Sequence, residues 1–216
     1  MRATASGTRA AILDAAEDLF ARQGFRTTTI KQIAARAGIN SALLYYYFAN
    51  KETLYREALR RLVETLAERA GAELRQAETP EDGVRQLVRN QAAFLLAHPL
   101  APRLIARELI EHGGRHVEGL VPVIAAGPFA RLCELVERGQ REGRFRRDLD
   151  PRFAALSTVA QVAYFALARP LVSTLLGYGA GGPPREVAEA FANHAGEFAV
   201  AALRAWPPGA DERSEA

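Results

Sequence analysis

Apolar residues recur at helical spacing along nearly the whole of this 216-residue chain. No segment alternates apolar and polar side chains as a half-buried strand would, and no internal repeat is visible. The spacing therefore predicts an all-α fold of about nine helices, with a break near residues 122–128 and a kink at Pro170. The helices are expected at about residues 8–23, 30–37, 41–48, 51–76, 80–98, 102–112, 129–141, 151–169 and 185–205.

The stretch from Thr29 to Phe48 combines two short helical patterns with one sharp turn between them. Gly38 suits the turn because glycine adopts a positive φ without a Cβ clash. Asn40 or Ser41 can cap the second helix by accepting a backbone N–H, so that helix is expected to begin near Ser41. The pattern predicts a helix-turn-helix. Its apolar positions are Ile30, Ile33, Ala34 and Ala37 before the turn, and Leu44 and Phe48 after it.

Charge is distributed unevenly along the chain. Residues 1–60 hold nine basic and five acidic side chains, whereas residues 61–216 hold nineteen and twenty. No acidic residue occurs between Asp18 and Glu52. Basic and small polar side chains can hold phosphates, and short or planar ones can reach base edges, so this segment is suited to a nucleic acid. The basic residues of the interval are Arg22, Arg26, Lys31, Arg36 and Lys51.

The segment GFRTTTIKQIAARAGINSALLYYYFANKETLY, from Gly24 to Tyr55, resembles the DNA-binding domain of the TetR family of transcriptional regulators. It has the family's Thr before the first motif helix, its I-A-x-x-A-G turn and its L-Y-x-x-F ending followed by N-K. Ala42 and Leu43 depart from the pattern, because many relatives carry Gly or another small residue followed by a small or polar one. Leu43 therefore suggests an apolar contact, such as one to a thymine methyl group.

The resemblance implies a three-helix DNA-binding domain in residues 1–50, with its motif at 29–48. A larger helical domain for effector binding and dimerisation is expected at 51–206, followed by a disordered tail at 207–216. The implied function is that of a ligand-responsive regulator, a homodimeric repressor that a small molecule releases from a near-palindromic operator. The alternative is a helical enzyme or small-molecule carrier whose basic N-terminus is incidental.

Within this domain, Thr29 and Lys51 stand at helix N-termini and are expected to contact phosphate. Ser41 and Tyr46 are expected to read bases, whereas Tyr45 is expected to pack with the apolar face of its helix against the first helix. The complete predicted DNA-contact set is Thr29, Lys31, Asn40, Ser41, Ala42, Leu43, Tyr46, Tyr47 and Lys51.

The rest of the chain predicts a mostly apolar effector cavity with few polar anchors, and hence a hydrophobic or aromatic small molecule rather than a sugar or nucleotide. The alternative is that the same aromatic residues fill a core without a cavity. Two segments, residues 151–176 and 185–205, carry more apolar surface than one neighbour can cover, which predicts a homodimer. The expected ligand-contact residues are Phe94, Leu104, Arg107, Phe129, Tyr164 and Phe165.

The sequence contains few signs of a metal site, a catalytic site or a reactive cysteine. His112 and His116 have the spacing of two metal ligands, with Glu108 and Glu111 nearby, but the Gly-Gly pair between them predicts a solvated loop, so neither a metal nor a cofactor is expected. No Gly-rich phosphate loop, nucleophile elbow or pair of catalytic carboxylates is visible, so no enzyme is expected. Cys133 is the sole cysteine, which excludes an intrachain disulfide, and its apolar helical face predicts a buried, unreactive thiol.

Two observations bear on location. Acidic residues interrupt the N-terminal segment, so it lacks the apolar core of a signal peptide. The most apolar uncharged stretch, residues 153–168, is 16 residues long and too short to cross a bilayer comfortably. A cytoplasmic protein is therefore expected.

Overall fold

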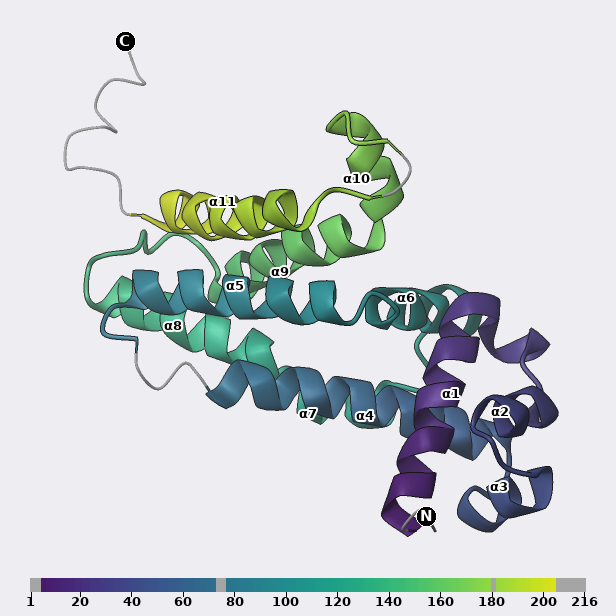
Figure 1. Ribbon diagram of the computed structural model, residues 1–216. Coiled ribbons are helices and arrows are strands. Elements are labelled where there is room, and N and C mark those ends of the chain that lie inside the picture. The colour runs from purple at the N-terminus through teal and green to yellow at the C-terminus, as the bar shows by residue number, and fades with distance from the viewer. Residues whose placement is uncertain (1–4, 73–76, 180–181, 205–216) are drawn as a thin grey trace. The chain divides into compact units, whose positions relative to one another are not determined.

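The computed structural model describes residues 5–72, 77–179 and 182–204 (Figure 1). Within these ranges the regular elements are helices, and the one β-type pairing is an isolated bridge between Phe145 and Arg204. The all-α prediction is confirmed. The chain divides into two compact units, the first of residues 1–65 and 98–123 and the second of residues 66–97 and 124–216. The tail predicted at residues 207–216 lies outside the described residues.

The first unit extends beyond the predicted domain of residues 1–50. Its longest helix, α1, includes Ala5, three residues before the predicted start at residue 8, and Gly24 leaves helical geometry inside it with φ 85° and ψ 168°, at the predicted stop. The remaining elements are α2, α3, the start of α4, α6 and the 3₁₀ turn η2. Their bounds are α1 Ala5–Thr27, α2 Ile30–Arg36, α3 Ser41–Tyr47, α4 Lys51–Ala72, α6 Ala101–His112 and η2 Glu118–Leu120.

The core of the first unit holds α2 and α3 against α1. Ile33 of α2 and Leu44 of α3 are fully buried, and so is Phe20 of α1. The ring of Phe20 meets the ring of Tyr55 edge-on, with centroids 4.9 Å apart, and Phe25 lies 5.0 Å from the same Tyr55 ring. Because Tyr55 belongs to α4, this aromatic group fixes the start of α4 to the end of α1.

The second unit contains the remaining helices, and α4 and α7 cross its boundary. The predicted break near residues 122–128 is confirmed at Gly127, whose φ of −88° and ψ of −136° interrupt the helical run. The predicted kink at Pro170 is confirmed too, since α9 and α10 are bent by 85°. The bounds are α5 Pro80–Ala97, α7 Val121–Ile124, η3 Ala125–Phe129, α8 Ala130–Arg141, α9 Pro151–Leu167, α10 Arg169–Leu175 and α11 Arg185–Leu203.

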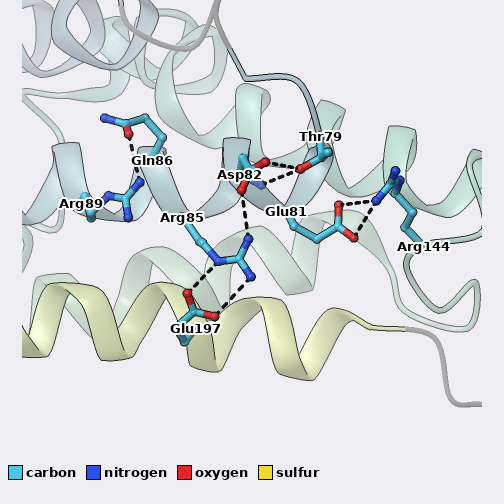
Figure 2. Close-up of polar contacts among 8 residues, drawn as sticks. All are labelled: Thr79, Glu81, Asp82, Arg85, Gln86, Arg89, Arg144 and Glu197. Atoms are coloured by element: carbon cyan, nitrogen blue, oxygen red, sulfur yellow. Dashed lines mark hydrogen bonds and ion pairs between the residues drawn. The ribbon is translucent and has the colours of Figure 1, made fainter.

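Helices α5 and α11 pack closely in the second unit. A Cβ at Gly196 of α11 would lie 3.4 Å from the Cα of Arg85 on α5, so the small residue permits the contact. Figure 2 shows the ion pair that flanks it: Arg85 donates to both carboxylate oxygens of Glu197, at 2.7 and 3.2 Å. Thr79 caps α5, because its Oγ1 accepts the backbone N–H of Asp82 at 3.2 Å.

By length and composition alone, one described run, Glu118–Arg141, is apolar enough to cross a membrane, and the bent pair α9–α10 passes the same test together. The first run is not a continuous helix, since Gly127 interrupts it. A run of this kind also occurs in the core of water-soluble helical proteins, so it is weak support for a membrane span.

Candidate nucleic-acid interface

Local capping fixes the start of α2. Thr29 Oγ1 accepts the backbone N–H of Gln32 at 3.2 Å, and Gln32 Oε1 accepts the backbone N–H of Thr29 at 2.8 Å. This reciprocal capping box satisfies two N–H groups that the first helical turn leaves without partners. The predicted phosphate contact of Thr29 stays a prediction, and its hydroxyl already serves this cap.

The turn between α2 and α3 has the predicted geometry. Gly38 adopts φ 70°, and a Cβ there would meet no atom within 4 Å, so the left-handed backbone alone accounts for the glycine. Asn40, rather than Ser41, caps α3: its Oδ1 accepts the backbone N–H of Leu43 at 2.8 Å. The two helices therefore have a sharply defined connection.

Helix α3 has one buried side and one exposed side. Leu44 and the adjoining Phe48 are 0% and 2% exposed, whereas Tyr46 is 81% exposed. Tyr45 is 52% exposed, so the prediction that it packs against the first helix is wrong. Consecutive residues of a helix are 100° apart around its axis. Because Leu44 points into the core, Tyr45 points away from it. Ala42 and Leu43 are also exposed, as base-contacting residues must be.

The basic residues around the motif differ in their partners. Arg22 and Arg36 both pair with Asp18, at 2.7 and 2.8 Å. In contrast, Lys31 and Arg26 are exposed and have no carboxylate within 4.0 Å among the described residues. These two side chains therefore retain positive charge that a phosphate could neutralise.

Lys51 makes contacts that the sequence did not predict. Its ammonium group donates to the backbone carbonyls of Phe25 and Thr28, at 2.9 Å each, and lies 4.4 Å from the centroid of the Phe25 ring. Burial lowers the pKa of Lys51 from its ordinary value. Lys51 thus fastens the start of α4 to the end of α1. Its predicted phosphate contact stays a prediction.

Taken together, α2 and α3 present cationic, amide and aromatic side chains on a scaffold with a buried apolar side. Seven residues of α3 span about 10 Å, and a B-DNA major groove about 12 Å wide admits such a helix. This arrangement can place phosphate contacts at α2 and base contacts at α3.

Comparison with known proteins identifies the family. Residues 12–58 match the model for bacterial regulatory proteins of the tetR family, and residues 80–190 match the tetracyclin repressor-like C-terminal domain. The chain belongs to the TetR family. It is 32% identical over 164 residues to the transcriptional repressor NicS of Pseudomonas putida. The aligned segment covers 74% of this chain and 76% of that relative. It is 29% identical to the transcriptional repressor KstR2 of Mycobacterium tuberculosis, covering 78% and 86%.

Solved structures show the same TetR fold. The fatty acid degradation regulator FadR of Bacillus halodurans aligns with a TM-score of 0.73 and 21% identity, over 92% of this chain and 97% of that one. Because its family and relatives are transcriptional regulators, this TetR-family protein is a DNA-binding regulator and not an enzyme. The alternative of a helical enzyme with an incidental basic N-terminus is therefore excluded.

The six residues predicted to bind ligand are divided between the two units of this TetR-family protein, and their role in ligand binding stays a prediction. Leu104 and Arg107 lie in the first unit, where Arg107 donates to the carbonyls of Ala21 and Arg22 at 3.2 Å each. Arg107 therefore faces α1 and not a cavity. In the second unit Tyr164 is 57% exposed and faces solvent. The other three are Phe94 and Phe165, both buried, and Phe129, which is half-buried.

A cavity of about 610 Å³ in the second unit has a different lining. It lies among α5, the start of α10 and α11, and three arginines contribute to its wall. Arg169 Nε is buried and has no hydrogen-bond partner among the residues that the structure describes. Sequence reasoning missed this site because its arginines are far apart in the chain. The lining comprises Arg89, Ala93, Leu96, Ala97, Arg169, Arg185, Glu189, Ala192 and Asn193.

The segment with His112 and His116 also differs from expectation. The prediction of a solvated loop is wrong, because the two histidine side chains are 8% and 5% exposed. The carboxylate of Glu108, which lies beside both imidazoles, is fully buried. Gly113 and Gly114 adopt φ values of 63° and 81° and turn the chain back toward Glu108. The glycine pair therefore brings the two imidazoles together instead of separating them.

Cys133 is half-buried, and its Sγ lies 3.8 Å from the carbonyl oxygen of Pro151. Burial, followed by the nearby carboxylates of Glu137 and Asp150, raises the pKa of the thiol. A raised pKa lowers the thiolate fraction near neutral pH and agrees with the prediction of an unreactive thiol.

Proposed function

We propose that this protein is a homodimeric, ligand-responsive repressor that binds a near-palindromic operator. The observation that carries the proposal is the exposed side of α3: Tyr46 is 81% exposed, whereas Leu44, on the other side of the helix, is fully buried. NicS, the relative described above, is itself a transcriptional repressor. A regulator of this kind acts on chromosomal DNA, which supports the expected cytoplasmic location.

In this proposal the predicted DNA-contact residues divide into two groups. Lys31, with Thr29 and Lys51, contacts phosphates and sets affinity for any sequence. The amide of Asn40 and side chains of α3 contact base edges and select the sequence. The second group consists of Asn40, Ser41, Ala42, Leu43, Tyr46 and Tyr47.

The exposed stripe along α9 supports the homodimer. Phe153, Leu156, Tyr164 and Leu167 recur at helical spacing and are 45–70% exposed, whereas Ala155, Thr158, Val162 and Phe165 are buried on the opposite side. Helix α11 adds Phe198, which is 56% exposed. An apolar stripe of this length on each protomer favours a second copy as its cover. Two-fold symmetry then requires half-sites about 34–36 Å apart, or a multiple of that distance.

The cavity of about 610 Å³ supports an effector site, because its volume lies in the range of small-molecule pockets. Its apolar surface agrees with the hydrophobic or aromatic ligand expected from sequence. Arg89 and Arg169 add a requirement: the ligand should also carry an anionic group that their guanidinium groups can bind. A carboxylic acid with an apolar body fits this combination.

Binding of the effector should weaken binding of the operator by shifting the population of protein conformations. Ligand bound in the second unit would favour a conformation in which α4 moves the two DNA-binding units off operator spacing. Because linkage is reciprocal, operator DNA should weaken ligand affinity by the same factor by which ligand weakens operator affinity.

An electrophoretic mobility shift with the DNA upstream of the protein's own gene tests the proposed function. The wild type should retard this duplex at concentrations that leave an unrelated duplex of equal length free. A variant with Tyr46→Ala should lose this preference while keeping its fold, as circular dichroism can check. Equal retardation of the two duplexes by the wild type would contradict the proposal.

The effector assignment has a separate test. A thermal-shift screen of carboxylic acids should give hits that Arg169→Gln abolishes. Arg152→Gln serves as the matched control, because Arg152 is 75% exposed and lies outside the cavity. Hits that both variants bind equally would place the effector site elsewhere.

A further inference from the structure

One buried carboxylate and two imidazoles meet in the first unit, at the end of α6. Glu108 Oε2 lies 3.2 Å from His112 Nδ1 and 3.0 Å from His116 Nδ1. The two imidazole centroids are 4.9 Å apart, and one ligand atom from each of the three residues lies within 4.8 Å of the other two. Three side chains that commonly bind metals therefore converge on one point.

The backbone builds this arrangement. Glu108 and His112 are four residues apart on α6, so they share one side of the helix. The helix ends at Gly113 in the left-handed conformation, and Gly114 continues the turn. The chain then returns far enough for the backbone N–H of His116 to donate to Glu108 Oε1 at 2.8 Å. The position of His116 is thus held by its backbone as well as by its ring.

The cluster leaves one polar atom without a hydrogen bond. His112 Nδ1 is buried and has no hydrogen-bond partner in the described part of the chain, although it lies 3.2 Å from the Glu108 carboxylate. A buried, unpartnered ring nitrogen is costly, and a fully buried carboxylate needs positive charge beside it. A cation bound between these atoms would satisfy both requirements.

We propose that Glu108, His112 and His116 form a binding site for a divalent transition metal ion, for which Zn²⁺ is the best fit. Bonds of about 2.0–2.2 Å at tetrahedral angles place two zinc ligands about 3.3 Å apart. The observed separations of 3.0 and 3.2 Å agree with this spacing. Two imidazoles and one carboxylate favour zinc or its transition-metal neighbours over magnesium or calcium. Water completes the fourth position.

Surrounding residues are suited to orient these ligands. His116 binds the metal through Nδ1 and carries its ring proton on Nε2, which lies 3.8 Å from Glu52 Oε1. The side chain of Tyr55 lies beside the Glu108 carboxylate. The rings of Phe25 and Tyr55 lie 5.2–6.1 Å from the imidazole centroids. A carboxylate beside a metal-bound histidine and an apolar surround are common features of zinc sites.

The proposed metal site lies where three helices of the first unit meet. Glu52 and Tyr55 belong to the first turns of α4, and Phe25 lies near the end of α1, so the metal would join α6 to both helices that support the DNA-binding motif. Bound zinc should therefore stabilise the first unit against unfolding, because it binds the folded arrangement and not the extended chain.

The test uses the full-length protein, stripped with a chelator and then titrated with Zn²⁺ alone, without DNA or effector. Calorimetry and elemental analysis should give one zinc per chain and a higher Tm. Co²⁺ should give the intense visible absorption of a tetrahedral site. The variants His112→Asn and His116→Asn keep a polar group near Glu108 but remove a ligand, and should weaken zinc binding by about 10- to 100-fold or more.

His194→Asn is the matched control, because His194 is exposed on α11 in the second unit, and it should bind zinc as the wild type does. Absence of stoichiometric zinc in the wild type would overturn the proposal and leave a hydrogen-bonded Glu-His-His cluster. Equal losses in the control and in the ligand variants would overturn it also. If a ligand variant fails to fold, the cobalt spectrum of the wild type decides. The result is independent of the proposed repressor function, since no step involves DNA.

Discussion

Helices α2 and α3 and the second unit carry out their proposed tasks by different means. The motif presents its polar and aromatic side chains outward from seven-residue helices. The position of a residue in the sequence therefore largely determines whether its side chain is exposed. In the second unit, by contrast, the arginines of the cavity come from α5, α10 and α11 and meet only when these helices pack. A surface that reads DNA can therefore be recognised from a local pattern. A cavity that binds a small molecule depends on the packing of distant segments.

The largest expected effect comes from the buried side of the motif. Leu44→Ala should lower the free energy of unfolding by about 2–5 kcal/mol, because Leu44 is fully buried and its removal leaves a cavity. Leu43→Ala, one residue earlier and 38% exposed, should change stability by less than about 0.5 kcal/mol. Urea unfolding monitored by circular dichroism compares the two. Similar losses would mean that α3 lacks the two distinct sides described here.

The second largest effect tests the exposed apolar stripe of the second unit. Phe198→Glu should convert the proposed dimer to monomer, since a charge inside an apolar interface costs about 2–4 kcal/mol. Asn193→Glu places the same charge elsewhere on α11 and should leave the dimer intact. Analytical ultracentrifugation measures both. A dimer that survives Phe198→Glu would locate the interface away from this stripe.

A smaller effect distinguishes two lysines of the first unit. Lys31→Ala should reduce the slope of log affinity against log salt by about one unit, without a change in stability. Lys51→Ala should reduce the slope similarly if Lys51 contacts phosphate, and should also cost about 1–3 kcal/mol of stability, because the carbonyls of Phe25 and Thr28 lose their donor. An unchanged slope for Lys51→Ala would assign that lysine a purely structural role. Fluorescence anisotropy at several salt concentrations measures the slopes.

The sequence predicted features that depend on local patterns and missed those that depend on contacts between distant segments. The turn at Gly38, the cap at Asn40 and the breaks at Gly127 and Pro170 depend on a few neighbouring residues, and they were predictable. Tyr45 was assigned to the wrong side of α3 because the apolar pattern of a short helix does not determine its rotation.

Contacts between distant residues were beyond prediction. Arg107 contacts carbonyls of α1 that are 85 and 86 residues away in the chain, which no local pattern indicates. His112 and His116 were assigned to a solvated loop because Gly113 and Gly114 were taken only as helix breakers. Their left-handed backbone, with φ values of 63° and 81°, is what returns His116 to Glu108.

The central claim is that the exposed side of α3 selects a DNA sequence. Selection from a library of random duplexes, with wild type and Ser41→Ala in parallel, tests it most directly. The account predicts that the wild type enriches a two-fold symmetric sequence, and that Ser41→Ala relaxes the preference at the same position in both half-sites, at a cost of about 1–3 kcal/mol in discrimination. A library that stays random after selection by the wild type, or an identical enriched sequence for the two proteins, would contradict it.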